Sequence, residues 1–376
     1  MAGADTSGGV SADTEEPGAV MDALDEDELT ATFTEDLWLD RLARKLGFGR
    51  LSEWLPGETP PSYLYALVLI GTIVPVLNGR AYLVGDPVVY LQNPFFVLQP
   101  IALLGAVYGS RALRRRYHQV TREMNIADRT RDPDKLIDIV PDWLPWAFFV
   151  SAVLLNYVRV LALGGPVAIY QDKGLSAVIG WMVVNPIWAS IAAQFFAVYL
   201  SVELIAPWRL WRSDIGIDFR DPEGLGGLRP LGELIKHAYY YMVAGLIAFA
   251  LVTYGPVLSV AEWGPTATTN VIFTTAWVAT VATVAYGVFT LHRFMRREKR
   301  RELHRLKQVE QKYTDDPWDI TAYTVSQDDQ EMVDEIRQRM ERVSATNEYP
   351  ATFSIWSQLL VSIVLPKAAQ LLIASV

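Results

Sequence analysis

Long apolar runs alternate with shorter charged segments along most of this chain. Seven runs approach the roughly twenty residues that an α-helix needs to cross the hydrocarbon core of a bilayer. The fourth run is long enough to tilt, and Tyr and Trp residues at several ends match the aromatic belt of membrane interfaces. The pattern predicts seven transmembrane helices, at Tyr63–Leu77, Phe95–Tyr108, Trp143–Leu163, Leu175–Ile205, Ala238–Val260, Val271–Leu291 and Ile355–Val376.

Basic residues predict the orientation, because Lys and Arg in short connections favour the cytoplasmic side of a membrane. The basic clusters all fall on one side of the predicted spans, at Arg41–Arg50, Arg111–Arg116, Arg209–Arg212 and Arg293–Arg301. The opposite connections carry only Arg80 and Lys173. We therefore expect an all-α polytopic protein of the plasma membrane, with a cytoplasmic N-terminus, the C-terminus outside and helical cytoplasmic extensions.

Polar segments predict the remaining organisation. The segment 37–61 sets Trp38 and Leu42 against basic residues, which is typical of an interfacial amphipathic helix. Around it we expect a disordered acidic tail at 1–36, transmembrane helices one to six within 62–292, cytoplasmic loops at 109–142 and 206–237, a cytoplasmic helical hairpin at 293–354 and the last span at 355–376.

Composition narrows the chemistry. The chain has 376 residues, a net charge of −9 and no cysteine, which excludes disulfides, thiolate catalysis and Cys-based metal sites. Its acidic stretches are typical either of a halophilic protein or of a disordered acidic tail. The four histidines are isolated, and no catalytic grouping is apparent. We expect no enzyme activity, no metal, no cofactor and no nucleic-acid partner.

Three ionisable residues lie inside predicted spans, where charges are expensive and mark functional candidates. Arg159 near the outer end of the third span and Glu203 near the inner end of the fourth are expected to extend to the nearest interface. Lys367 lies about halfway along the last span. Snorkelling, a structural partner and a water-filled pathway all remain open for Lys367.

The last predicted span is unusually polar, and Pro366 is expected to kink it. Its amides and hydroxyls either bond to neighbouring helices or offer weak, repeated contacts to a passing ion. The pore-lining candidates are Gln358, Ser362, Lys367 and Gln370. In such a pore, Lys367 would favour anions.

A glycine-rich stretch, Asp221–Gly227, separates the fourth and fifth predicted spans. Successive backbone N–H groups in such a stretch can form an anion-binding nest. The stretch lacks the Lys and the spacing of a phosphate loop, so the sequence favours a turn.

The layout resembles the seven-transmembrane ion channel superfamily, which includes the insect odorant and gustatory receptors. The resemblance covers Leu37–Val376, and Thr352-Phe353 followed by Gln358 is similar to a Thr-Tyr…Gln-Phe signature of the last helix, with Leu359 in place of Phe and a spacing one residue shorter. The resemblance implies a homotetrameric ion channel whose last helix lines the pore, with an anchor domain at 293–350.

Other functions remain open. The chain also fits a secondary transporter, or a membrane scaffold or signalling protein whose cytoplasmic helices bind partners. A retinal protein is disfavoured, because Ile363 stands four positions before Lys367, where that family has Asp. The expected partners are the lipid bilayer, further copies of the chain, and ions or a small molecule.

Overall fold

The computed structural model describes residues 37–54, 59–86, 88–255, 267–315 and 324–349, together with 364, 365, 367, 368, 370 and 371. The chain divides into two compact units, Met1–Leu37 and Trp38–Val376, and every element described below belongs to the second. The fold is all-α apart from a two-residue antiparallel pair, in which β1 (Thr314–Asp315) lies beside β2 (Thr324–Val325).

Six helical stretches among the described residues are long and apolar enough to cross a membrane. They coincide with the first six predicted spans, and they make the chain compatible with a multi-pass membrane protein. The stretches are α4 (Pro61–Val84), η1 with α6 (Pro94–Val97 and Leu98–Glu123), α9 (Trp143–Ala162), α10 to α12 (Gly165–Arg212), α13 (Arg229–Tyr254) and α14 (Ala267–Glu310). The seventh predicted span lies mostly outside the described residues.

Short helices complete the unit. They are α2 (Trp38–Lys45), α3 (Phe48–Trp54), α5 (Val89–Gln92), α7 (Ile126–Arg129), α8 (Asp134–Ile137) and α15 (Gln330–Ala345). Where the sequence predicted one amphipathic helix at 37–61, the structure has two. The break falls at Gly47, whose φ of 94° is a left-handed conformation that glycine adopts without strain.

Two predicted loops are partly helical. Within 109–142, α6 continues to Glu123, and within 206–237 both α12 (Ala206–Arg212) and the first turns of α13 are helical. Charged side chains at these ends do not interrupt a helix, so the end of an apolar run marks a change of surroundings and not the end of the helix.

The fourth stretch contains two π-helical turns, which sequence reasoning missed. It runs through α10 (Gly165–Ile179), η2 (Gly180–Val184), α11 (Asn185–Leu200), η3 (Ser201–Ile205) and α12. Pro186 follows η2 and Pro207 follows η3. A proline lacks an N–H and its ring crowds the carbonyl four residues earlier, and the wider π turn accommodates that carbonyl.

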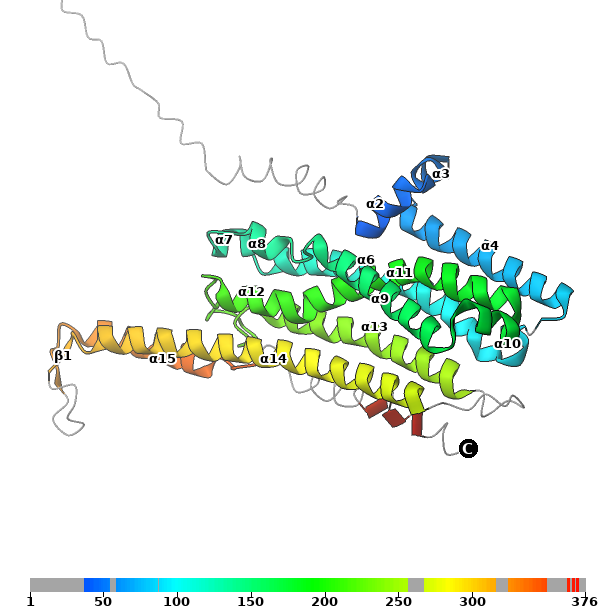
Figure 1. Cartoon of the computed structure of the whole chain (residues 1–376). Helices are drawn as coiled ribbons and strands as arrows, with labels where there is room; N and C mark the ends of the chain where they lie inside the picture. The colour runs from blue at the N-terminus through cyan, green and yellow to red at the C-terminus, as the bar shows by residue number, and fades with distance from the viewer. Residues whose placement is uncertain are drawn as a thin grey trace, which may run out of the picture. The chain divides into compact units, whose positions relative to one another are not determined.

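Helices α6, α11 and α13 form the centre of the bundle (Figure 1). Helix α6 packs against α4, α11 and α13, while α9 covers α11, and α14 packs on α12 and α13. Near the start of the unit, Trp38 and Leu39 of α2 join a buried apolar cluster with Tyr65 of α4, Val107 of α6 and Ile191 of α11. Close packing holds the members of this cluster that lie in candidate membrane spans, because lipid tails are as apolar as the side chains themselves.

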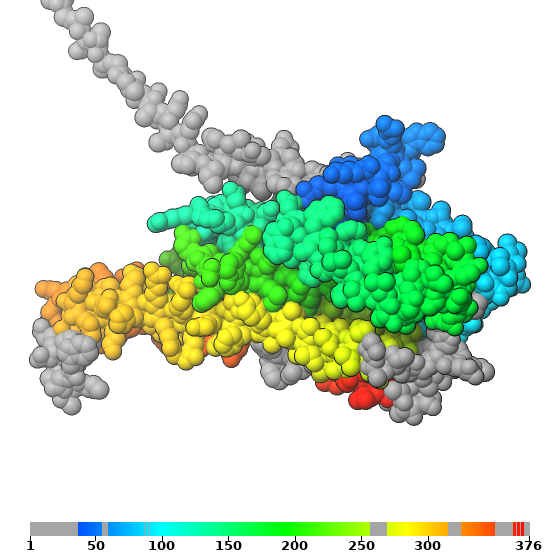
Figure 2. Space-filling model, in the orientation of Figure 1, coloured from blue at the N-terminus to red at the C-terminus, as the bar shows by residue number. Residues whose placement is uncertain are grey.

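Helix α14 extends well beyond the length of a membrane span. Along its second half, Leu306 packs against Ile336 and Val343 of α15 in a separate apolar cluster. Figure 2 shows α14 in yellow, with orange atoms of α15 beside its second half and red atoms of the last segment beside its first half.

Basic segments of several helices meet at one end of the bundle. The guanidinium of Arg293 on α14 lies over the ring of Trp211 on α12, 5.5 Å from its centroid. Arg116 of α6 lies 3.7 Å from the carboxylate of Glu233 near the start of α13. We call this the basic end of the bundle.

Candidate functional site

Polar side chains gather where the last segment meets α13 and α14. The ammonium group of Lys367 donates to Gln370 Oε1 at 2.6 Å and to Thr274 Oγ1 at 3.3 Å. The amide of Gln370 donates to the hydroxyl of Tyr254 at 2.8 Å, and that hydroxyl donates to Asn270 Oδ1 at 2.7 Å. We call these five residues the Lys367 cluster.

All five residues of the Lys367 cluster belong to the same copy of the chain. Tyr254 is fully buried, Gln370 is 7% exposed and Lys367 is half-buried. Among the described residues, the hydrogen-bond acceptors of Lys367 are neutral side chains. A positive charge is therefore held beside a buried tyrosine with amide and hydroxyl partners.

The depth of this cluster differs from the position that sequence alone indicated. Lys367 falls about halfway along the predicted last span, but Tyr254 is the last residue of α13 and Thr274 stands close to the start of α14. The cluster thus lies near the end of the α13–α14 pair that is remote from the basic end. The sequence did not indicate Tyr254, Asn270 and Thr274, because polar residues at the ends of predicted spans are expected at the membrane interface.

Glu203 lies on a different element, η3, which packs against the same helix pair nearer the basic end. It is 0% exposed, and neither carboxylate oxygen has a hydrogen-bond partner in the structure. Tyr199 of α11 and Tyr239 of α13 are close enough to interact with it electrostatically. The expectation that Glu203 extends to the membrane interface is wrong, because α13 and α14 enclose it.

The two polar positions are well separated. Tyr239 and Tyr254 mark them on α13, and 15 residues of α-helix rise about 22 Å. Gly287 and Thr274 mark them on α14 in the reverse order, as expected for antiparallel neighbours. The α13–α14 pair therefore packs against a buried acid of η3 nearer the basic end and against a lysine of the last segment near the other end.

Arg159 belongs to neither position. It is exposed, and its guanidinium stands 4.8 Å from the ring centroid of Trp181 on η2. Beside it, Asn156 donates to the Trp181 carbonyl at 2.8 Å and Tyr157 to the Met182 carbonyl at 3.1 Å. Met182 is four residues before Pro186, so Tyr157 satisfies the carbonyl that the proline leaves without its helical donor.

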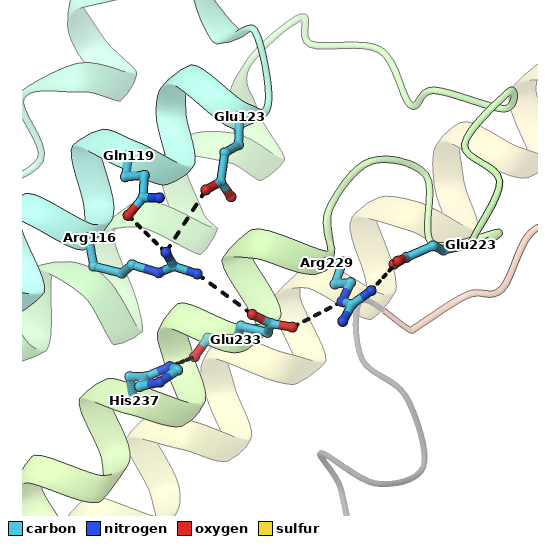
Figure 3. A network of polar contacts seen from close by, with 7 residues as sticks. All are labelled: Arg116, Gln119, Glu123, Glu223, Arg229, Glu233 and His237. Carbon is cyan, nitrogen blue, oxygen red and sulfur yellow. Dashed lines mark hydrogen bonds and ion pairs between the residues drawn. The ribbon is translucent and has the colours of Figure 1, made fainter.

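A chain of charged side chains links α6 to α13 at the basic end (Figure 3). Glu233 lies 3.7 Å from Arg116 of α6 and accepts a hydrogen bond of 2.9 Å from Arg229, which also pairs with Glu223. The backbone carbonyl of Glu233 accepts from His237 Nδ1 at 2.7 Å. These side chains are partly exposed, and such pairs contribute about 0–1 kcal/mol each, so we read the network as bracing between helices.

The glycine-rich stretch forms a nest, but its own aspartate fills it. The Asp221 carboxylate accepts from the backbone N–H of Glu223, Leu225 and Gly227 at 2.8–3.0 Å. Gly226 and Gly227 have φ of 67° and 71°, which lets these N–H groups converge. The stretch is therefore a self-satisfied turn and not an anion site.

The chain returns along α14 after α15. Lys299 donates to the carbonyls of Ser344 and Thr346, each at 2.7 Å. Further along, His292 Nδ1 lies 2.9 Å from the Glu348 carbonyl, and its ring stacks on Tyr349 with centroids 4.2 Å apart. Residues 344–349 thus run antiparallel to α14, towards the Lys367 cluster.

The structure brings Lys367 and Gln370 together, and it separates both from Glu203 and Arg159. The other two pore-lining candidates, Gln358 and Ser362, lie outside the described residues. Among the described residues, no three His, Asp or Glu side chains gather as a metal site would require.

No family model, curated protein or solved structure matches this chain.

Proposed function

We propose that this chain crosses the membrane seven times and forms an ion channel from four copies, with the last crossing lining the pore. The proposal needs a last segment with one side bound to its own subunit and another side free. Gln370 is buried against Tyr254, whereas Leu365 is exposed. This division of the last segment is the observation that carries the proposal.

The seventh crossing is supported by two contacts with α14. Tyr349 meets His292, and Lys367 meets Thr274. Each pair of positions is 18 residues apart in the sequence, and 18 residues of α-helix rise about 27 Å. Since the hydrocarbon core is about 30 Å thick, a segment running beside α14 between these contacts would cross it.

The exposed side of the last segment indicates which candidate residues would line the pore. In a helix, positions 358, 362 and 365 share one face, so the exposed Leu365 marks the face to which we assign Gln358 and Ser362. Gln370 is buried on another side and is withdrawn as a pore-lining residue. Lys367 and Gln370 instead attach the last segment to α13 and α14.

A secondary transporter is a second candidate, and Lys367 favours it. Within the part of the chain that the structure describes, the acceptors of its ammonium group are neutral, which leaves its charge open to an anionic substrate. In this alternative the pathway lies inside the subunit, beside the Lys367 cluster, and not on an axis between subunits.

Reconstitution of the purified protein into sealed liposomes separates the two. The channel predicts a tetramer and passive flux of monovalent ions, altered by Ser362→Ala and unchanged by Lys173→Ala. A transporter predicts saturable anion uptake that Lys367→Ala abolishes and Lys367→Arg retains. A monomer without passive flux would overturn the channel, and a protein without either flux would overturn both and leave a scaffold or signalling role.

A further inference from the structure

Glu203 is placed where an ionised carboxylate would be unstable. The side chain is fully buried, and both of its oxygens lack a hydrogen-bond donor in the structure. An uncompensated charge in such a place costs several kcal/mol, even after the protein relaxes. The neutral, protonated acid is the form that this environment holds.

The backbone at Glu203 is as unusual as its side chain. Glu203 lies on the π turn η3, and its carbonyl is the one that Pro207, four residues later, leaves without a helical donor. Helix α14 closes over this carbonyl at Gly287, where an added Cβ would stand 2.6 Å from the oxygen. Only glycine permits this approach, and π turns inside helices are frequent at functional sites.

The groups around Glu203 suit a proton as its ligand and do not suit a metal ion. The titratable groups that face it are Tyr199 from α11 and Tyr239 from α13, while α14 contributes the uncharged Gly287 and Thr283, the latter hydrogen-bonded to Tyr199 at 3.0 Å. From α6, Arg114 and His118 line a small cavity with Val198 and Val202, the residues beside Tyr199 and Glu203. A metal ion needs several ligands, and no cluster of His, Asp and Glu is present among the described residues.

The route for proton exchange leads to the basic end. Gly287 stands five residues before His292 on α14, about 7.5 Å along the helix axis. The Lys367 cluster is about 20 Å away in the opposite direction, across the buried Thr280 and Val284. Separation of η3 from α14 would therefore expose Glu203 first to the solution at the basic end.

We propose that Glu203 is a reversible proton-binding site, closed by the contact between η3 and α14 at Gly287. The carboxyl group holds its proton while the contact is closed, and it releases the proton towards the basic end when α14 moves away. Movement of α14 is thereby coupled to proton binding. This proposal does not depend on ion conduction, because it concerns one acid and the helix that covers it.

Infrared spectroscopy of the full-length protein in lipid at neutral pH tests this directly. The expected result is a carbonyl band of a protonated carboxylic acid, identified by its shift in D₂O, that Glu203→Gln removes. The exposed-acid variant Asp172→Asn should retain the band. A wild-type protein without this band, or a band unchanged in Glu203→Gln, would overturn the proposal.

A second pair of variants tests the role of α14. Gly287→Ala pushes α14 away from the Glu203 carbonyl, so we expect the band to weaken at neutral pH as water reaches the acid. Gly245→Ala on α13 is the matched control, because nothing lies within 4 Å of the added Cβ. If Gly287→Ala and Gly245→Ala have the same helix content and carbonyl bands of equal intensity, the proposed closure by α14 is overturned. The spectra require no flux, so their failure is distinguishable from failure of the channel.

Discussion

The amide of Gln370 donates a hydrogen bond of 2.8 Å to the hydroxyl of Tyr254, which ties the last segment of the chain to the end of α13. Tyr254 is fully buried, and its hydroxyl also reaches Asn270 on α14. One tyrosine hydroxyl therefore connects three segments that are distant in sequence. This relationship explains how a polar last segment packs against apolar helices.

Removing that hydroxyl should destabilise the protein. In Tyr254→Phe, the buried amide of Gln370 loses its acceptor, and an unsatisfied buried polar group costs about 1–3 kcal/mol. Asn270 is exposed, so water can replace the donor that it loses. We expect a loss of this size in the free energy of unfolding in detergent. Tyr170→Phe, at an exposed tyrosine of α10, is the control and should have little effect. Equal stabilities of the two variants would show that the hydrogen bond is not formed.

Asp40 and Arg111 form a second buried link. The Asp40 carboxylate is fully buried, pairs with Arg111 of α6, and accepts from the Ser62 N–H at the start of α4. Asp40→Ala leaves Arg111 without its carboxylate, and breaking a buried pair costs about 3–5 kcal/mol. Chemical unfolding should show this loss. Asp142→Ala removes the exposed partner of Arg41 and should cost at most about 1 kcal/mol.

The same pair permits a stricter check. In a double-mutant cycle, Asp40→Ala and Arg111→Ala together should cost less than the sum of the two single variants, because the first change already leaves the partner unpaired. Additive losses would mean that the two side chains do not interact.

Asp221 organises the glycine-rich turn through three backbone N–H groups. In Asp221→Ala these groups lose their acceptor, so amide exchange at Glu223, Leu225 and Gly227 should accelerate by at least about tenfold, the factor that 1.4 kcal/mol produces. Hydrogen-exchange mass spectrometry measures this. Asp172→Ala, at an exposed aspartate of α10, should leave the turn unchanged. Unchanged exchange in Asp221→Ala would show that the nest is held by other contacts.

The sequence predicted the positions of the six long apolar helices well, because transfer of apolar residues from water depends on composition over about twenty positions. It predicted the end of α6 less well, because α6 continues beyond Tyr108 through the basic residues Arg114–Arg116 to Glu123. The helical continuation of the sixth predicted span beyond residue 293 was expected, and α14 continues to Glu310. Charged residues can end an apolar run without ending the helix, and hydropathy alone does not distinguish these two boundaries.

The candidate site shows a similar division. The sequence identified Lys367 and Glu203 as costly residues and Gln370 as part of a polar stripe, but it placed Glu203 at an interface. Burial of Glu203 depends on Gly287, 84 positions later, which lets α14 approach the backbone of η3. No local pattern carries that contact. The prolines 186 and 207 are the local signal that could have indicated the two π turns.

The crossing of the last segment is the central claim, and site-directed labelling tests it most directly. Since the chain has no cysteine, Gln338→Cys on α15 and Val376→Cys at the end of the chain each introduce a single thiol. A membrane-impermeant maleimide applied to intact cells and then to inverted vesicles reports the side of each thiol. We predict labelling of Val376→Cys from outside only and of Gln338→Cys from inside only. Labelling of both positions from the same side would contradict the seventh crossing and the pore built on it.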